Sequence, residues 1–301
     1  MNLAVVDVSL RRAKIHTIDV SSPLDELDAL LTFTQELTRG KAEEYPLFAL
    51  FTGPLTGTGA PGSGGYGFLW RDQAGFSGTF CEGRIGAMLR HAGISHLVVH
   101  GRAKKPLYLD IDDTGVTVRD SDKLAALPLV EQTAHIARGN DSDDVAVLVR
   151  TTLENDDATL MEDCVFPQSA PGLTTLWDDM NVTALSASGS GGITLAKPDK
   201  FLAECMALYQ HKAIVDPAAP FRQYGTPVMG RYLSPWPGKP SDQAEEAMLL
   251  PARVLGLAWN KTMPFSGPMA HAVKLLTHAT GTKFSAKSVT EHATKLIEKM
   301  G

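Results

Sequence analysis

The segment GPLTGTGAPGSGGYG, residues 53–67, holds seven glycines and two prolines in fifteen positions. Glycine weakens helices and strands, and proline interrupts both, so this segment excludes any long regular element. It directly follows the apolar run PLFALF, residues 46–51, which is typical of a buried strand. The chain is therefore expected to leave a sheet here and to turn tightly, with backbone packed closely against backbone.

The same segment contains a formal G-x-G-x-x-G pattern at Gly62, Gly64 and Gly67. A dinucleotide site of this type needs a strand, a tight turn and then a helix whose N-terminus receives the pyrophosphate. The strand is predicted, but FLWRDQAGF follows Gly67 and does not predict a helix. The pattern therefore favours turns and close packing over a dinucleotide site.

Strand signals dominate the first two thirds of the chain, and helical signals dominate the last third. Hairpins are predicted over 3–20, 106–120 and 144–166, and helices over 24–40 and 83–93. Further helices are predicted over 198–214, 266–281 and 288–300, after an irregular stretch at 216–241. Ser288 and Glu291 have the spacing of a capping box for the last helix. We expect an α+β fold, with a two-sheet domain and inserted helices over 1–195 and a smaller helical region over 196–301.

Composition and charge exclude several classes of protein. The chain is 44% hydrophobic with a net charge of −6 and no long basic run, which argues against a nucleic-acid partner. No apolar run approaches the ~20 residues of a membrane span. Three widely spaced cysteines, at 81, 164 and 205, favour a reducing compartment over a disulfide scaffold. With no signal-peptide pattern at the N-terminus, we expect a cytoplasmic protein.

The amino-acid sequence of the glycine-rich segment resembles the motif GPLTGT-x-AP-x-GGRY of the tungsten-pterin aldehyde ferredoxin oxidoreductase family. The stretch SGTFCEGRIGAMLRHAGISHLVVHGRAKKPLYLDI, residues 77–111, also resembles that family. Weaker similarity is found at 3–20, 195–206, 221–228 and 270–300. The resemblance touches both ends of the chain, and it is most specific at 53–61 and 86–109.

The resemblance implies an N-terminal domain of two β-sheets that form a saddle under a bis-pterin cofactor. The cofactor carries tungsten, or molybdenum in relatives, and a magnesium ion links the pterin phosphates. Downstream domains of the family supply the four cysteines of an iron–sulfur cluster. The implied chemistry is oxidation of an aldehyde to an acid, with electrons leaving through the cluster to a ferredoxin-type acceptor.

The chain departs from the family pattern where the cofactor is expected. The arginine of the GGR segment, the natural partner of a phosphate, falls at Gly65, and a carboxylate, Glu82, stands where small residues cradle the phosphate. No C-x-x-C motif is present, so we expect no iron–sulfur cluster in this chain. If a cofactor binds, its contacts are predicted at the positions around this site, namely Gly64, Gly65, Gly83, Arg84 and Arg71.

Other candidate sites have weaker signals. His91, His96 and His100 are close in sequence, yet one is on a predicted helix and two are on a strand, so no metal site is predicted. Glu162, Asp178 and Asp179 suggest paired carboxylates, but nothing in the sequence fixes them side by side. We assign no catalytic residue.

Two functions follow from these observations. The first is a truncated, degenerate paralogue that does not oxidise aldehydes by itself and binds a pterin or another anionic ligand, or serves as an accessory subunit. Its expected partner is a second copy or a full-length oxidoreductase relative. The second is an active tungsten- or molybdenum-pterin oxidoreductase subunit whose partner supplies the iron–sulfur cluster.

Overall fold

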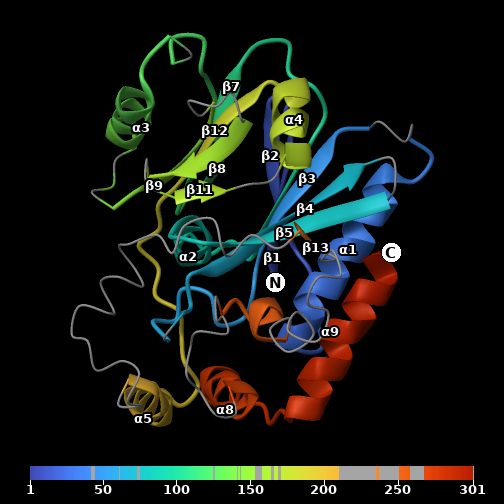
Figure 1. Cartoon of the computed structure of the whole chain (residues 1–301), viewed down its shortest axis with the longest axis vertical. Helices are drawn as coiled ribbons and strands as arrows, with labels where there is room; N and C mark the ends of the chain where they lie inside the picture. The colour runs from blue at the N-terminus through green and yellow to red at the C-terminus, as the bar shows by residue number, and fades with distance from the viewer. Residues whose placement is uncertain are drawn as a thin grey trace.

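The structure is a computed structural model of the chain. It describes the residue ranges 1–41, 45–60, 62–72, 75–124, 126–140, 142, 144–152, 158–163, 166–168, 171–209, 235–236, 251–257 and 268–300. Two mixed sheets and several helices form an α+β fold, as predicted (Figure 1). Within the described residues, no helix combines the length and the apolar character that crossing a membrane requires.

The first sheet has seven described strands and a central strand that is buried on both faces. In spatial order the strands are β13 (Pro235–Trp236), β5 (Gly75–Glu82), β4 (Gly65–Asp72), β3 (Leu47–Thr52), β6 (His96–His100), β1 (Asn2–Asp7) and β2 (Arg12–Thr17). Strands β1 and β6 run parallel, and the other described pairs are antiparallel. Alternate side chains of β3 enter opposite cores, with Phe48 on one face and Phe51 on the other, which explains the continuous apolar run.

The second sheet has six described strands and lies over the first. Its order is β11 (Phe166–Gln168), β10 (Ala158–Glu162), β9 (Ala146–Thr152), β12 (Val182–Ala187), β7 (Leu107–Asp112) and β8 (Gly115–Asp120). Strands β7 and β8 form the predicted hairpin, which turns at Asp113 and Thr114. The predicted pairing of β9 with β10 is also confirmed.

The main core lies between the two sheets, together with two short helices. These are α2 (Ile85–His91) and α4 (Pro171–Met180), which contribute Leu89 and Trp177 to the same buried cluster as Phe48. Trp177 stacks on Phe48 with a centroid distance of 5.3 Å. A third helix, α3 (Leu129–Arg138), covers the other face of the second sheet.

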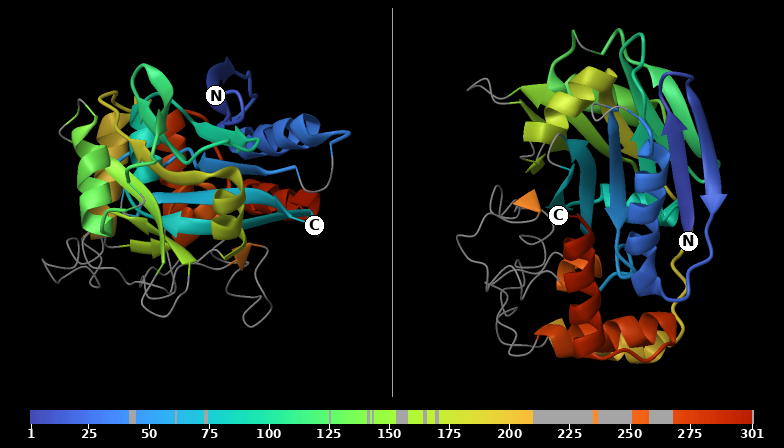
Figure 2. Two further views of the ribbon diagram at one scale, coloured as in Figure 1. Left: turned by 90° about the horizontal axis from the view of Figure 1, so that it is seen from above. Right: turned by 90° about the vertical axis from the view of Figure 1, so that its right-hand side faces the viewer.

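The outer face of the first sheet is covered by helices from both ends of the chain. The 3-10 helix η1 (Pro23–Asp25) leads into α1 (Glu26–Thr38), whose buried leucines at 27, 30 and 31 follow the helical period. Helix α9 (Ala286–Met300) lies beside α1 and buries Leu296 in the same cluster (Figure 2). Helices α5 (Pro198–Tyr209) and α8 (Pro268–Thr280) pack together below them.

The predicted capping box of the last helix is wrong by one turn. Helix α9 begins at Ala286, so Ser288 lies inside its first turn. Ser285 is the cap, because its hydroxyl accepts from the amide of Ser288 at 3.0 Å and the Ser288 hydroxyl accepts from the amide of Ser285 at 3.1 Å. Glu291 forms an exposed ion pair with Lys287 instead. The predictions for 210–214 and most of 216–241 lie outside the described residues.

Glycines explain why the β4–β5 hairpin carries no clear strand signal. A side chain at Gly67 of β4 would place its Cβ 2.3 Å from the Phe51 ring, so glycine is needed for the ring to cross the strand. The sequence predicts turns through the whole of 53–67, whereas in the structure the turn ends at Gly64 and β4 begins at Gly65. Glycines therefore occur here both in a turn and at the start of a strand, and the strand cannot be recognised from the sequence pattern.

The glycine-rich segment binds backbone from the far end of the chain. The amide of Leu55 donates to the carbonyl of Leu255 at 2.9 Å, and the amide of Gly65 donates to the carbonyl of Gly256 at 3.1 Å. Inside the segment, the Thr56 hydroxyl accepts from the amide of Gly53 and donates to the carbonyl of Gly65. A Cβ at Gly53 would lie 2.1 Å from the nitrogen of Gly256. The space beside the backbone of Gly53 is thus occupied by the backbone of residues 255–256, which explains why this position is a glycine.

We expect Gly53→Ala to lower the free energy of unfolding by about 2–4 kcal/mol, because rigid backbone cannot move away from the new methyl group. Urea unfolding of the full chain measures this change. The matched control is Gly192→Ala, since a Cβ at Gly192 would have no atom within 4 Å and the φ there is not positive. The control should stay within about 0.5 kcal/mol of the unaltered chain. Equal stability of the two variants would contradict the close approach.

Candidate functional site

Four of the five predicted cofactor contacts lie together, and the fifth lies apart. Gly65 of β4 pairs with Glu82 of β5, and the amide of Gly83 donates to the carbonyl of Gly64 at 3.1 Å. Arg84 follows directly and precedes α2. Arg71 is near the other end of β4, where it pairs with Phe76. The structure therefore brings Gly64, Gly65, Gly83 and Arg84 into one place and leaves Arg71 outside it.

A buried carboxylate, Glu162, occupies the centre of this cluster. Glu162 ends strand β10 of the second sheet and has no solvent exposure. Its Oε1 accepts from the amides of Arg84 and Ile85 at 2.5 and 2.8 Å, and its Oε2 accepts from the Tyr66 hydroxyl at 2.7 Å. The carboxylate thus binds the first free amides of α2 as a capping side chain does.

Gly83 is the position that lets this carboxylate approach. A Cβ at Gly83 would lie 1.9 Å from Oε2 of Glu162, and every one of its three nearest atoms belongs to that side chain. The small residue that the family resemblance assigns to phosphate contact therefore contacts an internal anion. The sequence alone identifies Glu162 as a candidate carboxylate but does not predict its neighbours. The feature that could have indicated its burial is its position directly after the apolar run ATLM.

The guanidinium of Arg84 is held by two further acidic residues. It donates to Asp163 at 3.1 Å, and it also binds Asp144. The Arg84 side chain is 44% exposed, so these ion pairs contribute modestly to stability. The two ion pairs nevertheless orient the Arg84 guanidinium toward carboxylates of this chain.

Burial shifts the acid–base behaviour of the cluster. Desolvation, with a further contribution from the charge of Asp163, raises the pKa of Glu162 to about 7. Desolvation and the charge of Glu162 raise the pKa of the neighbouring Glu82 to about 7 as well. Burial also raises the pKa of Cys81, which lies on the same strand as Glu82. With pKa values of about 7, the two carboxyl groups are partly protonated near neutral pH.

These residues do not fit an anionic cofactor in the arrangement that the structure shows. A phosphate at the start of α2 would have to displace Glu162 from two amides and a hydroxyl. It would also meet Glu82 and would have to compete with two aspartates for Arg84. The arrangement is complementary to the chain's own carboxylate.

The other candidate groups are separated from one another. His96 is buried with its Nδ1 accepting from the amide of Thr52, His100 contacts the Tyr45 hydroxyl, and His91 contacts the carbonyl of Gly57. Asp178 pairs with Arg150, and Asp179 pairs with Arg102. None of these groups joins Glu162.

Metal-binding clusters are likewise missing from the part of the chain that the structure describes. No three His, Cys, Asp or Glu side chains come together there in a way that could hold a metal ion. Cys81 and Cys205 are buried in different cores, and Cys164 lies outside the described residues.

Comparison with known proteins relates the first half of the chain to one family. Residues 29–150 match the family model described as aldehyde ferredoxin oxidoreductase, N-terminal domain. The tungsten-containing aldehyde ferredoxin oxidoreductase of Pyrococcus furiosus is 30% identical over 155 residues, which cover 50% of this chain and 26% of that protein. The protein of the same name from Thermococcus kodakarensis matches with the same identity and coverage. That of Pyrococcus abyssi is 39% identical over 75 residues. The matched part of the first two relatives is thus about a quarter of their length.

A solved structure shares the fold. The active site complex BamBC of benzoyl coenzyme A reductase, in complex with 1,5-dienoyl-CoA, superimposes with a TM-score of 0.56 and 18% sequence identity. The superposition covers 69% of this chain and 33% of that chain. At this identity the similarity concerns the fold alone.

The raised pKa of Glu162 predicts a pH-dependent stability. The folded chain binds more protons than the unfolded chain between the ordinary pKa of 4.5 and about 7, so the stabilisation is complete below that window and is lost as pH rises through it. Glu162→Gln keeps an oxygen for the two amides and removes the charge. We expect this variant to match the unaltered chain near pH 5 and to exceed its free energy of unfolding at pH 8 by about 1–3 kcal/mol.

Urea unfolding at several values between pH 5 and pH 8 measures the difference. The control is Glu131→Gln, on the exposed face of α3, which should leave the pH dependence unchanged. A difference between Glu162→Gln and the unaltered chain that does not vary with pH would contradict the prediction.

Proposed function

We propose that this chain, which carries the N-terminal domain of the aldehyde ferredoxin oxidoreductase family over residues 29–150, is a non-catalytic member of that family. It serves as an accessory partner of a second copy or of a longer oxidoreductase relative. It does not oxidise aldehydes by itself and does not hold a bis-pterin cofactor at the start of α2. The division into a two-sheet domain up to residue 195 and a helical region after it belongs to the same proposal.

One observation supports this proposal above the others, namely the position of Glu162. Glu162 accepts from the amides of Arg84 and Ile85, which are the donors that a phosphate at the start of α2 would need. Gly65 supplies no guanidinium in place of the family arginine, and Arg84 pairs with Asp144 and Asp163. Three separate features thus oppose an added negative charge in this place.

A second candidate function is that of an active tungsten- or molybdenum-pterin subunit acting on aldehydes. The identity of 30% over 155 residues to tungsten-containing aldehyde ferredoxin oxidoreductases favours it. In that case Glu162 and Glu82 would be protonated, Arg84 would turn from its aspartates to the cofactor phosphate, and a partner chain would supply the iron–sulfur cluster.

Metal analysis of protein purified from its native host separates the two functions. We expect tungsten and molybdenum at background level and no fluorescent pterin after oxidative extraction. Stoichiometric metal with extractable pterin would overturn the accessory role. The second function further requires that Arg84→Gln lose the metal while Arg102→Gln, an exposed arginine paired with Asp179, retain it.

Native mass measurement tests the accessory role itself. Tagged chain isolated from its host should have the mass of an assembly, either with a second copy or with a longer relative. A chain that stays monomeric across the concentration range, and that isolates without a longer relative, would contradict the role. The measurement does not depend on metal content, so the two tests fail independently.

A further inference from the structure

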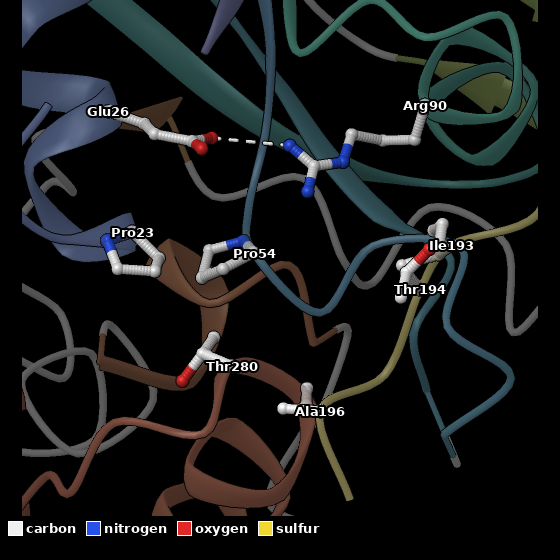
Figure 3. A pocket seen from close by; sticks show the side chains of 9 residues that line it. Pro23, Glu26, Pro54, Arg90, Ile193, Thr194, Ala196 and Thr280 are labelled. Carbon is white, nitrogen blue, oxygen red and sulfur yellow. Dashed lines mark hydrogen bonds and ion pairs between the residues drawn. The ribbon is translucent and has the colours of Figure 1, made fainter. Parts of the chain in front are cut away.

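A cavity lies at the opposite end of α2 from Glu162. Its volume is about 350 Å³, and it forms where the start of α1, the glycine-rich segment, the end of α2, residues 193–196 and the end of α8 meet (Figure 3). Its apolar wall is formed by two prolines, two alanines and one isoleucine, namely Pro23, Pro54, Ala196, Ala279 and Ile193. A cavity of this size suits a small molecule.

Two opposite charges form the polar edge of this cavity. Nη1 of Arg90, from α2, lies 3.2 Å from Oε2 of Glu26, from α1. Their side chains are only 17% and 13% exposed, so solvent screens them far less than a surface pair. Behind them, Nε2 of His96 is 3.8 Å from Oε2 of Glu26. Burial, with the charge of Arg90, lowers the pKa of His96 to about 3, so His96 adds no positive charge.

Both charged groups keep unused bonding capacity toward the cavity. A guanidinium has five N–H donors, and among the described residues Arg90 donates one hydrogen bond, to Glu26. Figure 3 shows the second terminal nitrogen of the guanidinium pointing away from Glu26, on the side where Pro54 lies. Within the same part of the chain, the polar contacts of Glu26 all use Oε2, which leaves Oε1 as an acceptor. The edge therefore offers a cationic donor and an anionic acceptor side by side.

We propose that this cavity binds a small zwitterion, a free α-amino acid with an aliphatic side chain. Its carboxylate binds the open edge of the Arg90 guanidinium, and its ammonium group donates to Oε1 of Glu26. The side chain packs on Pro23, Pro54 and Ile193. The site is distinct from the α2 N-terminus and does not rest on the proposed function.

Charge explains why a zwitterion fits better than a simple ion. A lone carboxylate in this cavity would be repelled by Glu26, and a lone ammonium group would be repelled by Arg90. Each of the two charges of a zwitterion meets its opposite, and the buried site stays neutral overall. Carboxylate and guanidinium also match in shape, which adds directional bonds.

Calorimetry with three matched probes tests the ligand class on the full chain. L-leucine carries both charges, 4-methylpentanoate lacks the ammonium group, and 3-methylbutylamine lacks the carboxylate. We expect leucine to bind at least tenfold more tightly than either analogue. No binding of leucine, or binding of either analogue as tight as that of leucine, would overturn the proposal.

Variants test the location. Arg90→Gln should abolish leucine binding, and Glu26→Gln should reverse the preference, so that 4-methylpentanoate binds more tightly than leucine. Thr194→Trp fills the cavity from an exposed position and should also abolish binding without touching the ion pair. The control Arg102→Gln should bind leucine as the unaltered chain does. Circular dichroism confirms folding of each variant, and leucine binding by a folded Thr194→Trp chain would overturn the site.

Discussion

The two sheets and the short helix between them meet at a single buried carboxylate. Glu162 belongs to the second sheet, Tyr66 belongs to the first, and the amides of Arg84 and Ile85 begin α2. Burying an acidic group is costly unless its oxygens are hydrogen-bonded, and here both oxygens are. One side chain thus accepts hydrogen bonds from the first sheet and from α2, and it belongs to the second sheet. The apolar core packs around this carboxylate, and these three donors are all hydrogen-bonded.

Several helices and hairpins of the fold can be predicted from local patterns in the sequence. Local strand, turn and helix signals predict the hairpins β1–β2 and β7–β8 and the helix α1, and the structure contains all three. The β4–β5 hairpin is not predictable in this way. Its glycine at 67 serves a close approach to the Phe51 ring, and that ring is distant in sequence. Propensity cannot report a contact whose partner lies elsewhere in the chain.

The candidate site shows the same limit more sharply. The family resemblance locates Gly64, Gly65, Gly83 and Arg84, and the structure brings them together. Whether they contact a cofactor remains a prediction. The carboxylate that fills their centre comes from β10, seventy-eight positions after Arg84, and no local motif announces it. The cap of the last helix is another feature that the sequence pattern predicts wrongly. Ser285 caps the helix through its hydrogen bond to the amide of Ser288, although the spacing of Ser288 and Glu291 predicts a cap at Ser288.

The backbone contact between the glycine-rich segment and residues 255–256 has a consequence for the order of synthesis. The segment leaves the ribosome well before its partners Leu255 and Gly256 are made. Until then the amides of Leu55 and Gly65 lack the carbonyl groups that they bind in the folded chain. Domains generally fold as units from the N-terminus during synthesis, and long-range pairings form late. The glycine-rich segment therefore reaches its final packing only after residues 255–256 have been made, well after the two strands that flank it, β3 and β4.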